Sequence, residues 1–138
     1  VNRAIELGKL PPARCITAGV KIHGYMLGVD EGALGIYGAD AEGIRKLMID
    51  EPELNVPIYK GYNYLKAEVI WMLRNEMARS IEDVLSRRMR LLFLDAKGAL
   101  LLAPEVASLM AEELGRDTHW VETQILDFKN LVKQYLLS

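Results

Sequence analysis

Apolar residues recur at helical spacing from residue 40 to the end of the chain. Ile44, Leu47 and Met48 follow Asp40, a candidate helix N-cap, and this first pattern stops before Pro52. A later seam alternates steps of four and three residues: Val121, Ile125, Phe128, Val132 and Tyr135. Such spacing places all members on one face of a helix. The region therefore predicts amphipathic helices that pack on one another.

Four further helical segments are predicted between these two. They cover residues 62–79, 81–88, 91–102 and 104–114. Ser80 and Asp83 resemble a capping box that restarts the chain, and Asp95 is suited to cap the second half of its segment. Pro104 suits a first helical turn, Gly115 suits a left-handed stop, and Asp117 or Thr118 starts the last helix. The buried stripe of residues 62–79 is predicted to consist of Tyr64, Ala67, Trp71 and Ala78, flanked by Ile70, Leu73 and Met77.

The beginning of the chain is rich in glycine and lacks the helical spacing of apolar residues. Seven of the 11 glycines lie in its first 38 residues, and this density disfavours long helices. Val20 and Ile22 alternate with polar residues, which is a weak strand signal within residues 15–26. We expect an irregular, partly extended strap there.

Length and composition fit one folded domain. The chain has 138 residues, of which 51% are hydrophobic and 26% charged, so disorder is excluded. We expect a single all-α domain: an irregular strap over residues 1–39 and a bundle of five or six helices over residues 40–138. The net charge of −2 gives no positive field for nucleic acid. The single cysteine, Cys15, allows no intrachain disulfide and fits the cytoplasm. No apolar stretch has the length of about 20 residues that spans a bilayer.

No catalytic, cofactor-binding or metal-ligating set is predicted. His23 and His119 lie 96 positions apart, and neither has ligand partners at the spacing of a metal site. Cys15 lacks an oriented base, and evenly spaced Gly32, Gly35 and Gly38 match no phosphate-binding loop. The aromatic residues on apolar stripes are expected to serve core packing: Trp71, Trp120, Phe128 and Tyr135.

The charged residues of the middle segments allow two interpretations. Arg87, Arg88 and Arg90 either form an anion or nucleic-acid patch or pair with neighbouring acids. Pairing is favoured, because Asp83 and Arg87 are four residues apart on one helix face. We predict a structural ion-pair network that links the 62–79 and 81–88 helices, with the members Glu68, Glu76, Asp83, Arg87, Arg88 and Arg90.

One run of sequence resembles a known family. Residues 67–96 read AEVIWMLRNEMARSIEDVLSRRMRLLFLDA, and this progression is similar to the C-terminal domain of FAD-dependent glycerol-3-phosphate dehydrogenases and alpha-glycerophosphate oxidases. Matching residues include the AEV of 67–69, Arg74, the EMA of 76–78, the EDVL of 82–85, Arg87, Arg88, Arg90 and the FLDA of 93–96. Met89, where the family commonly has threonine, and Arg116, where it often has an aromatic residue, are local departures.

The resemblance implies a longer parent enzyme. Such a parent oxidises glycerol 3-phosphate to dihydroxyacetone phosphate by hydride transfer to FAD, and passes the electrons to quinone or, in the oxidases, to oxygen. This chain begins with Val1 and carries no dinucleotide fingerprint, so we expect it to be a C-terminal, non-catalytic fragment without a cofactor of its own. The implied partners are the missing FAD-binding and substrate-capping domains, with no nucleic acid. A homodimer and a peripheral contact of the parent with the inner face of a membrane stay open.

An alternative of a different class is an independent helical interaction domain or a DNA-binding regulatory domain that uses the arginine-rich helix. DNA binding with a steep salt dependence distinguishes this alternative, and the net charge of −2 predicts that such binding is negligible at physiological salt.

Overall fold

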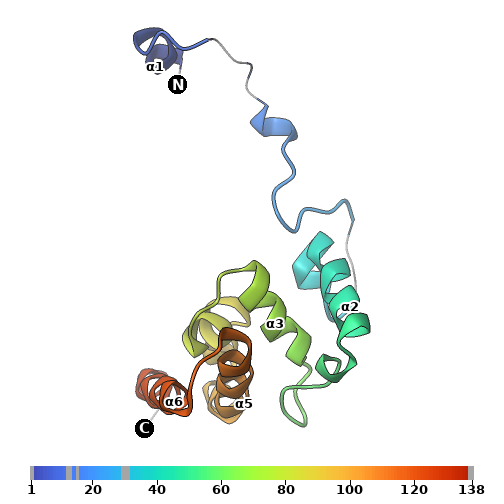
Figure 1. The fold of residues 1–138 in the computed structure, drawn as a ribbon, viewed down its shortest axis with the longest axis vertical. Coiled ribbons are helices and arrows are strands. Elements are labelled where there is room, and N and C mark those ends of the chain that lie inside the picture. The colour runs from blue at the N-terminus through green and yellow to red at the C-terminus, as the bar shows by residue number, and fades with distance from the viewer. Residues whose placement is uncertain (1, 12–13, 15, 29–31, 137–138) are drawn as a thin grey trace.

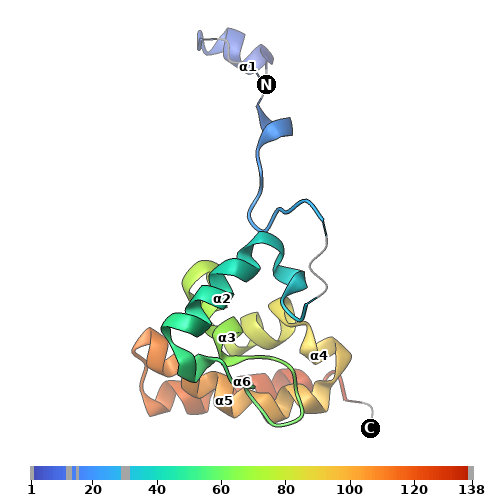
Figure 2. The same cartoon turned by 90° about the vertical axis from the view of Figure 1, so that its right-hand side faces the viewer.

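The computed structural model describes residues 2–11, 14, 16–28 and 32–136, and its regular elements are helical. Cys15 lies outside the described residues. The bundle consists of α2 (Ala41–Asp50), α3 (Lys66–Asn75), the π-helical turn η4 (Asp83–Arg88), α4 (Leu91–Leu94), α5 (Ala96–Leu114) and α6 (Thr118–Val132), arranged as in Figures 1 and 2. The predicted all-α fold class is confirmed.

Shorter helical segments precede the bundle or, in the case of η3, connect two of its helices. They are α1 (Asn2–Leu7), and the 3₁₀ turns η1 (Thr17–Gly19), η2 (Gly35–Asp40) and η3 (Pro52–Leu54). The weak strand signal at Val20 and Ile22 was wrong, because the described part of residues 15–26 holds η1 and no strand. Pro57 and Leu65 form an isolated antiparallel bridge. Figures 1 and 2 show the first residues running away from the bundle.

Several predicted helix ends are confirmed. Asp95 caps α5, since its carboxylate accepts a hydrogen bond from the Gly98 N–H. Gly115 ends α5 in the left-handed conformation with φ of 62°, and Asp117 caps α6 by accepting from the Trp120 N–H. Local chemistry therefore sets these boundaries.

Two other predicted ends were wrong. Pro104 does not begin a helix but lies inside α5, which starts at Ala96 because Asp95 already caps that end. Pro104 is exposed, and because it has no N–H it cannot donate the usual helical hydrogen bond to the Leu100 carbonyl. The side chain of Asp40 does not cap α2, because it pairs with His23 of the strap instead.

The helix predicted over residues 62–79 is shorter than expected. It spans Lys66–Asn75 and stops where Met77 adopts a left-handed φ of 54°. Met77 is therefore 79% exposed and not in the buried stripe, whereas Met72 is buried. Tyr64 precedes the helix and is half-buried. Tyr135, placed on the last seam, lies beyond α6, is 45% exposed and stacks edge-on against Phe93.

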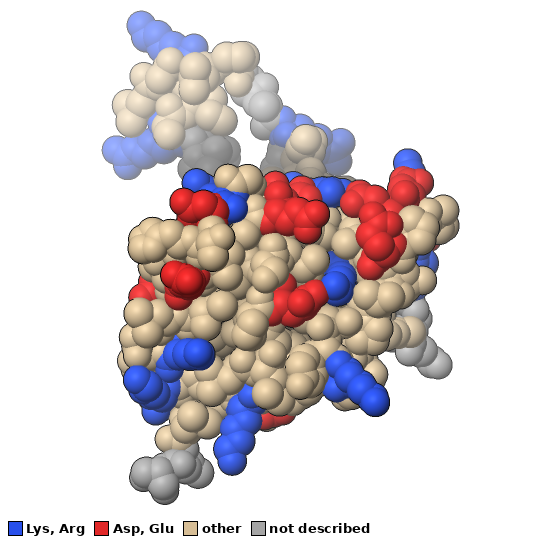
Figure 3. All heavy atoms as spheres, turned by 60° about the horizontal axis from the view of Figure 1, so that its bottom comes forward, with Lys and Arg blue, Asp and Glu red and all other residues tan. Residues whose placement is uncertain are grey.

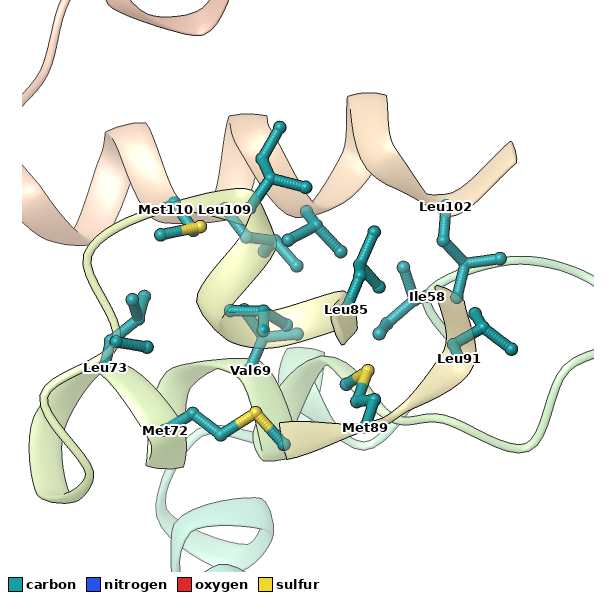
Figure 4. Packing of buried hydrophobic residues seen from close by; sticks show 14 of the residues in the cluster. Ile58, Val69, Met72, Leu73, Leu85, Met89, Leu91, Leu102, Leu109 and Met110 are labelled. Carbon is teal, nitrogen blue, oxygen red and sulfur yellow. The ribbon is translucent and has the colours of Figure 1, made fainter. Parts of the chain in front are cut away.

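The core lies where α3, η4, α4 and α5 converge. Figure 4 shows Leu85 of η4 between residues of α3, such as Val69, and residues of α5, such as Leu102. Phe128 and Val132 of α6 are buried in the same cluster, while Trp71 and Trp120 are half-buried at its edge. The apolar seams thus join all helices of the bundle into one core.

The contact between α2 and α3 depends on a glycine. A Cβ atom on Gly43 would overlap the indole ring of Trp71. We expect Gly43→Ala to lower the free energy of unfolding by about 1–3 kcal/mol, because the ring must shift. In a Trp71→Leu background the clash is absent, and the same change should instead raise stability by up to about 1 kcal/mol through helix propensity. Urea unfolding of the four proteins measures both values, and a stabilising Gly43→Ala in the wild-type background would contradict the packing.

Candidate functional site

The predicted ion-pair residues lie mainly around the turn between α3 and η4. The Arg88 Nε lies 3.2 Å from the Glu76 carboxylate, and both side chains are half-buried. Arg88 also donates hydrogen bonds to the carbonyl oxygens of Glu76 and Asp83. One guanidinium group thus bonds to the end of α3 and to the first turn of η4, so it bridges the two segments that the sequence predicted to be linked.

Asp83 organises the start of the next helical segment. Its carboxylate accepts hydrogen bonds from the N–H groups of Arg79 and Ser80, both at 3.0 Å, and its own N–H donates to the Ser80 hydroxyl at 3.2 Å. This is the predicted capping box. Arg87 forms an ion pair with Asp83 and a second one, at 2.7 Å, with Glu82. Burial alone would raise the pKa of Asp83, but these hydrogen bonds outweigh it and lower the pKa.

Glu68 is a buried carboxylate on the first turn of α3. Its side chain is 3% exposed; it accepts hydrogen bonds from the Tyr37 hydroxyl at 2.9 Å and from the Leu65 N–H at 2.7 Å. Burial raises the pKa of Glu68, and the two hydrogen bonds only partly oppose this effect. Burial, together with the Glu68 charge, also raises the pKa of Tyr37. The pair joins η2 to α3.

This raised pKa makes stability depend on pH. The folded state binds a proton at Glu68 more tightly than the unfolded state, so the Glu68 contribution destabilises the fold as pH rises above the ordinary glutamate range, near 4.3. We expect the stability of Glu68→Gln relative to wild type to increase from about pH 4 to pH 7. Urea unfolding at both values measures the difference, and a difference that is constant with pH would contradict the raised pKa. Glu113→Gln is the control of opposite sign, because the Arg74 partner lowers the pKa of Glu113.

The predicted six residues are not all brought together. Glu76 meets Arg88, and Asp83 meets Arg87, but Glu68 bonds to Tyr37 and a backbone N–H. Within the described residues, Arg90 has no ion-pair partner; it is exposed and adopts a left-handed φ of 57° before α4. That these contacts act as one energetic network remains a prediction.

A second ion-pair hub was missed by the sequence analysis. The Arg74 guanidinium forms hydrogen bonds to Glu113 at 2.7 and 2.8 Å and to Glu51 at 2.6 and 3.4 Å. It thereby ties α3 to α5 and to the end of α2. The bonds to Glu113 and Glu51 raise the pKa of Arg74. Its partners are 39 and 23 residues away, so no local spacing signals the cluster.

The described residues were compared with the patterns that bind a metal ion or a dinucleotide. No cluster of three or more histidine, cysteine or acidic side chains suited to a metal ion forms among them. A dinucleotide pyrophosphate needs a strand, a glycine turn and a helix N-terminus in succession, and the described elements contain no strand. In the described part of the chain, no helix combines the length and the apolar character needed to cross a bilayer.

The arginines are poorly suited to bind nucleic acid. Arg87 and Arg88 are already bonded to acidic residues and to backbone carbonyls of the same chain. On the face shown in Figure 3, basic side chains are scattered among acidic and uncharged ones and form no continuous stripe. The DNA-binding alternative is unsupported.

Comparison with known proteins assigns the family. Residues 15–121, well over half of the chain, match the family described as the C-terminal domain of alpha-glycerophosphate oxidase. The chain belongs to this family. The match covers η2, α2, α3, η4, α4 and α5, and therefore the Glu76–Arg88 bridge and the Arg74 hub. No solved structure matches the chain.

Curated relatives of this family member carry consistent names. The chain is 32% identical over 97 residues to "Probable glycerol-3-phosphate dehydrogenase, mitochondrial" of Dictyostelium discoideum. The matched segment covers 70% of this chain and 15% of that protein. It is 30% identical over 102 residues to "Glycerol-3-phosphate dehydrogenase" of Mycobacterium leprae, covering 74% of this chain and 17% of the relative. A mitochondrial glycerol-3-phosphate dehydrogenase of Macaca fascicularis is 34% identical over 74 residues, 54% of this chain and 10% of its own length. The chain thus spans about one sixth of the first two relatives.

Proposed function

We propose that this chain is the non-catalytic C-terminal domain of a longer FAD-dependent glycerol-3-phosphate dehydrogenase. The observation that carries the proposal is the family match over residues 15–121 together with relatives named glycerol-3-phosphate dehydrogenase that are about six times longer than the matched segment. The longer enzyme oxidises glycerol 3-phosphate to dihydroxyacetone phosphate and transfers the electrons through FAD to quinone. The FAD-binding and substrate-capping domains of that polypeptide are the partners of this domain.

The geometry supports a structural role for this domain. Arg88 pairs with the Glu76 carboxylate and donates to the Asp83 carbonyl oxygen. The Asp83 carboxylate accepts from the Arg79 N–H, and Glu68 accepts from the Tyr37 hydroxyl. A general acid or base must lie within hydrogen-bond reach of the reacting atom of a substrate, whereas the contacts of these four side chains are with groups of the same domain. We propose accordingly that residues 1–138 act as one domain, with the strap as its connection to the catalytic part.

The test begins with the whole coding region upstream of Val1. We expect it to encode a strand, a G-x-G-x-x-G turn and a helix, the unit that binds the FAD pyrophosphate. The longer polypeptide should then reduce a dye when glycerol 3-phosphate is added, with oxygen consumption measured in parallel to separate an oxidase from a dehydrogenase. An upstream region without a flavin-binding unit would overturn the proposal.

A further inference from the structure

A groove opens between η2 and the corner that joins η4 to α4. It has a volume of about 680 Å³, and its lining includes Tyr37, Tyr64 and Met89. Ile36 of η2 and Leu94 of α4 also line it, and each is 76% exposed. Figure 2 shows η2 and α4 close to each other on the right-hand side of the bundle. Large apolar side chains that are exposed together around a concave surface are typical of a contact surface.

Arg90 contributes a positive charge to this groove, and no ion-pair partner for it lies in the described part of the chain. Its neighbour Arg88 also lines the groove, but the donors of Arg88 bond to Glu76 and Asp83. Arg90 is held in a left-handed conformation between the buried residues Met89 and Leu91, which keeps its exposed side chain at the corner. An arginine without an ion-pair partner among the described residues is suited to bind a carboxylate of a docked protein.

The strap reaches the bundle beside the same groove. The His23 Nδ1 lies 2.6 Å from the Asp40 carboxylate, and the Ala39 N–H donates to the Gly24 carbonyl at 3.1 Å. Asp40 and Ala39 follow Tyr37, which lines the groove. Before this anchor, the strap carries exposed apolar side chains, with Ile16 72% and Ile22 76% exposed. These side chains also lack a cover within the described structure.

The length of the relatives indicates which part of the polypeptide covers the groove. The matched segment is 15–17% of the first two relatives, and the family is a C-terminal domain, so the bulk of such a protein precedes the strap. We propose that the groove and residues 16–28 of the strap together form the surface on which this domain docks against the preceding, FAD-binding part of the same polypeptide. That part presents apolar side chains to Ile36 and Leu94 and a carboxylate to Arg90. This inference rests on the proposed function.

Hydroxyl-radical footprinting with mass spectrometry tests the docking surface. The 138-residue chain and the longer polypeptide are labelled side by side. We expect modification of Ile36 and Leu94 to fall roughly fivefold in the longer polypeptide, because an interface core excludes water. Ile49 of α2 and Leu126 of α6, 76% and 59% exposed, are the matched controls and should not change. Equal modification of Ile36 and Leu94 in both proteins would overturn the docking surface.

Two further arms separate the alternatives. In the longer polypeptide, Arg90→Glu should raise the modification of Leu94 back towards its level in the 138-residue chain. The control Arg116→Glu, at another exposed position, should leave the modification of Leu94 low. Equal protection of Leu94 from modification in the two variants would overturn the role of Arg90. Protection of Leu94 that appears in the 138-residue chain alone as its concentration rises would show that a second copy fills the groove and would overturn the proposal. A flavin-binding part that is present but gives no protection defeats the docking surface alone, whereas its absence defeats the proposed function as well.

Discussion

Arg88→Gln is expected to lower the free energy of unfolding by about 2–4 kcal/mol, because it breaks a partly buried ion pair and removes the donor from two partly buried carbonyl oxygens. The arginine bonds to the Glu76 carboxylate and to the carbonyl oxygens of Glu76 and Asp83. Glutamine is too short to reach all three. Urea or thermal unfolding of the 138-residue chain measures the loss.

The same experiment tests the predicted network through a double-mutant cycle. Glu76→Gln should cost less than Arg88→Gln, because the bonds from Arg88 to the two backbone carbonyls survive. The double mutant should be more stable than the sum of the single effects predicts, by about 1–2 kcal/mol. Arg87→Gln is the matched control: Arg87 is 57% exposed, so its loss should have a much smaller effect. Strict additivity of Glu76→Gln and Arg88→Gln would show that the contact carries no coupling.

Leu85→Ala is expected to destabilise the chain by about 2–5 kcal/mol, the range for a leucine removed from a packed core. Leu85 is fully buried on η4, and its side chain lies among residues of α3 and α5 in Figure 4. The backbone of η4 is held at both ends, by the Asp83 capping box and by the bond from the Met89 N–H to the Val84 carbonyl. It therefore cannot easily collapse into the cavity.

Leu126→Ala serves as the control for this core substitution. Leu126 is 59% exposed on α6, so removal of its side chain should leave the midpoint of urea unfolding nearly unchanged. Equal losses in the two variants would contradict the assignment of Leu85 to the core and of Leu126 to the surface.

Local chemistry explains what could be predicted from the sequence. Asp95, Asp117 and Gly115 act within three or four residues of their own positions, so their roles as caps and stop follow from spacing alone. Pro104 misled because the same residue is acceptable at a first turn and on the exposed side of a long helix. Pro104 lies inside the helix because Asp95 caps α5 nine residues earlier.

Long-range contacts explain what the sequence could not show. The partners of Arg74 come from α5 and from the end of α2, and the Glu68 partner Tyr37 is 31 residues upstream. Both sets of contacts form only when the folded chain brings these distant residues together. The sequence predicted Glu68 as a member of a network with arginines, but a tyrosine hydroxyl and a backbone N–H are its hydrogen-bond donors, and they satisfy the buried carboxylate.

Dye-linked oxidation of glycerol 3-phosphate by the purified 138-residue chain, assayed with added FAD, tests the central claim most directly. The claim is that the ionic and apolar side chains of this domain hold its helices together and perform no reaction. We predict a chain that is helical by circular dichroism, retains no flavin after gel filtration and reduces no dye. A folded chain that keeps FAD and reduces the dye in response to glycerol 3-phosphate would contradict the claim.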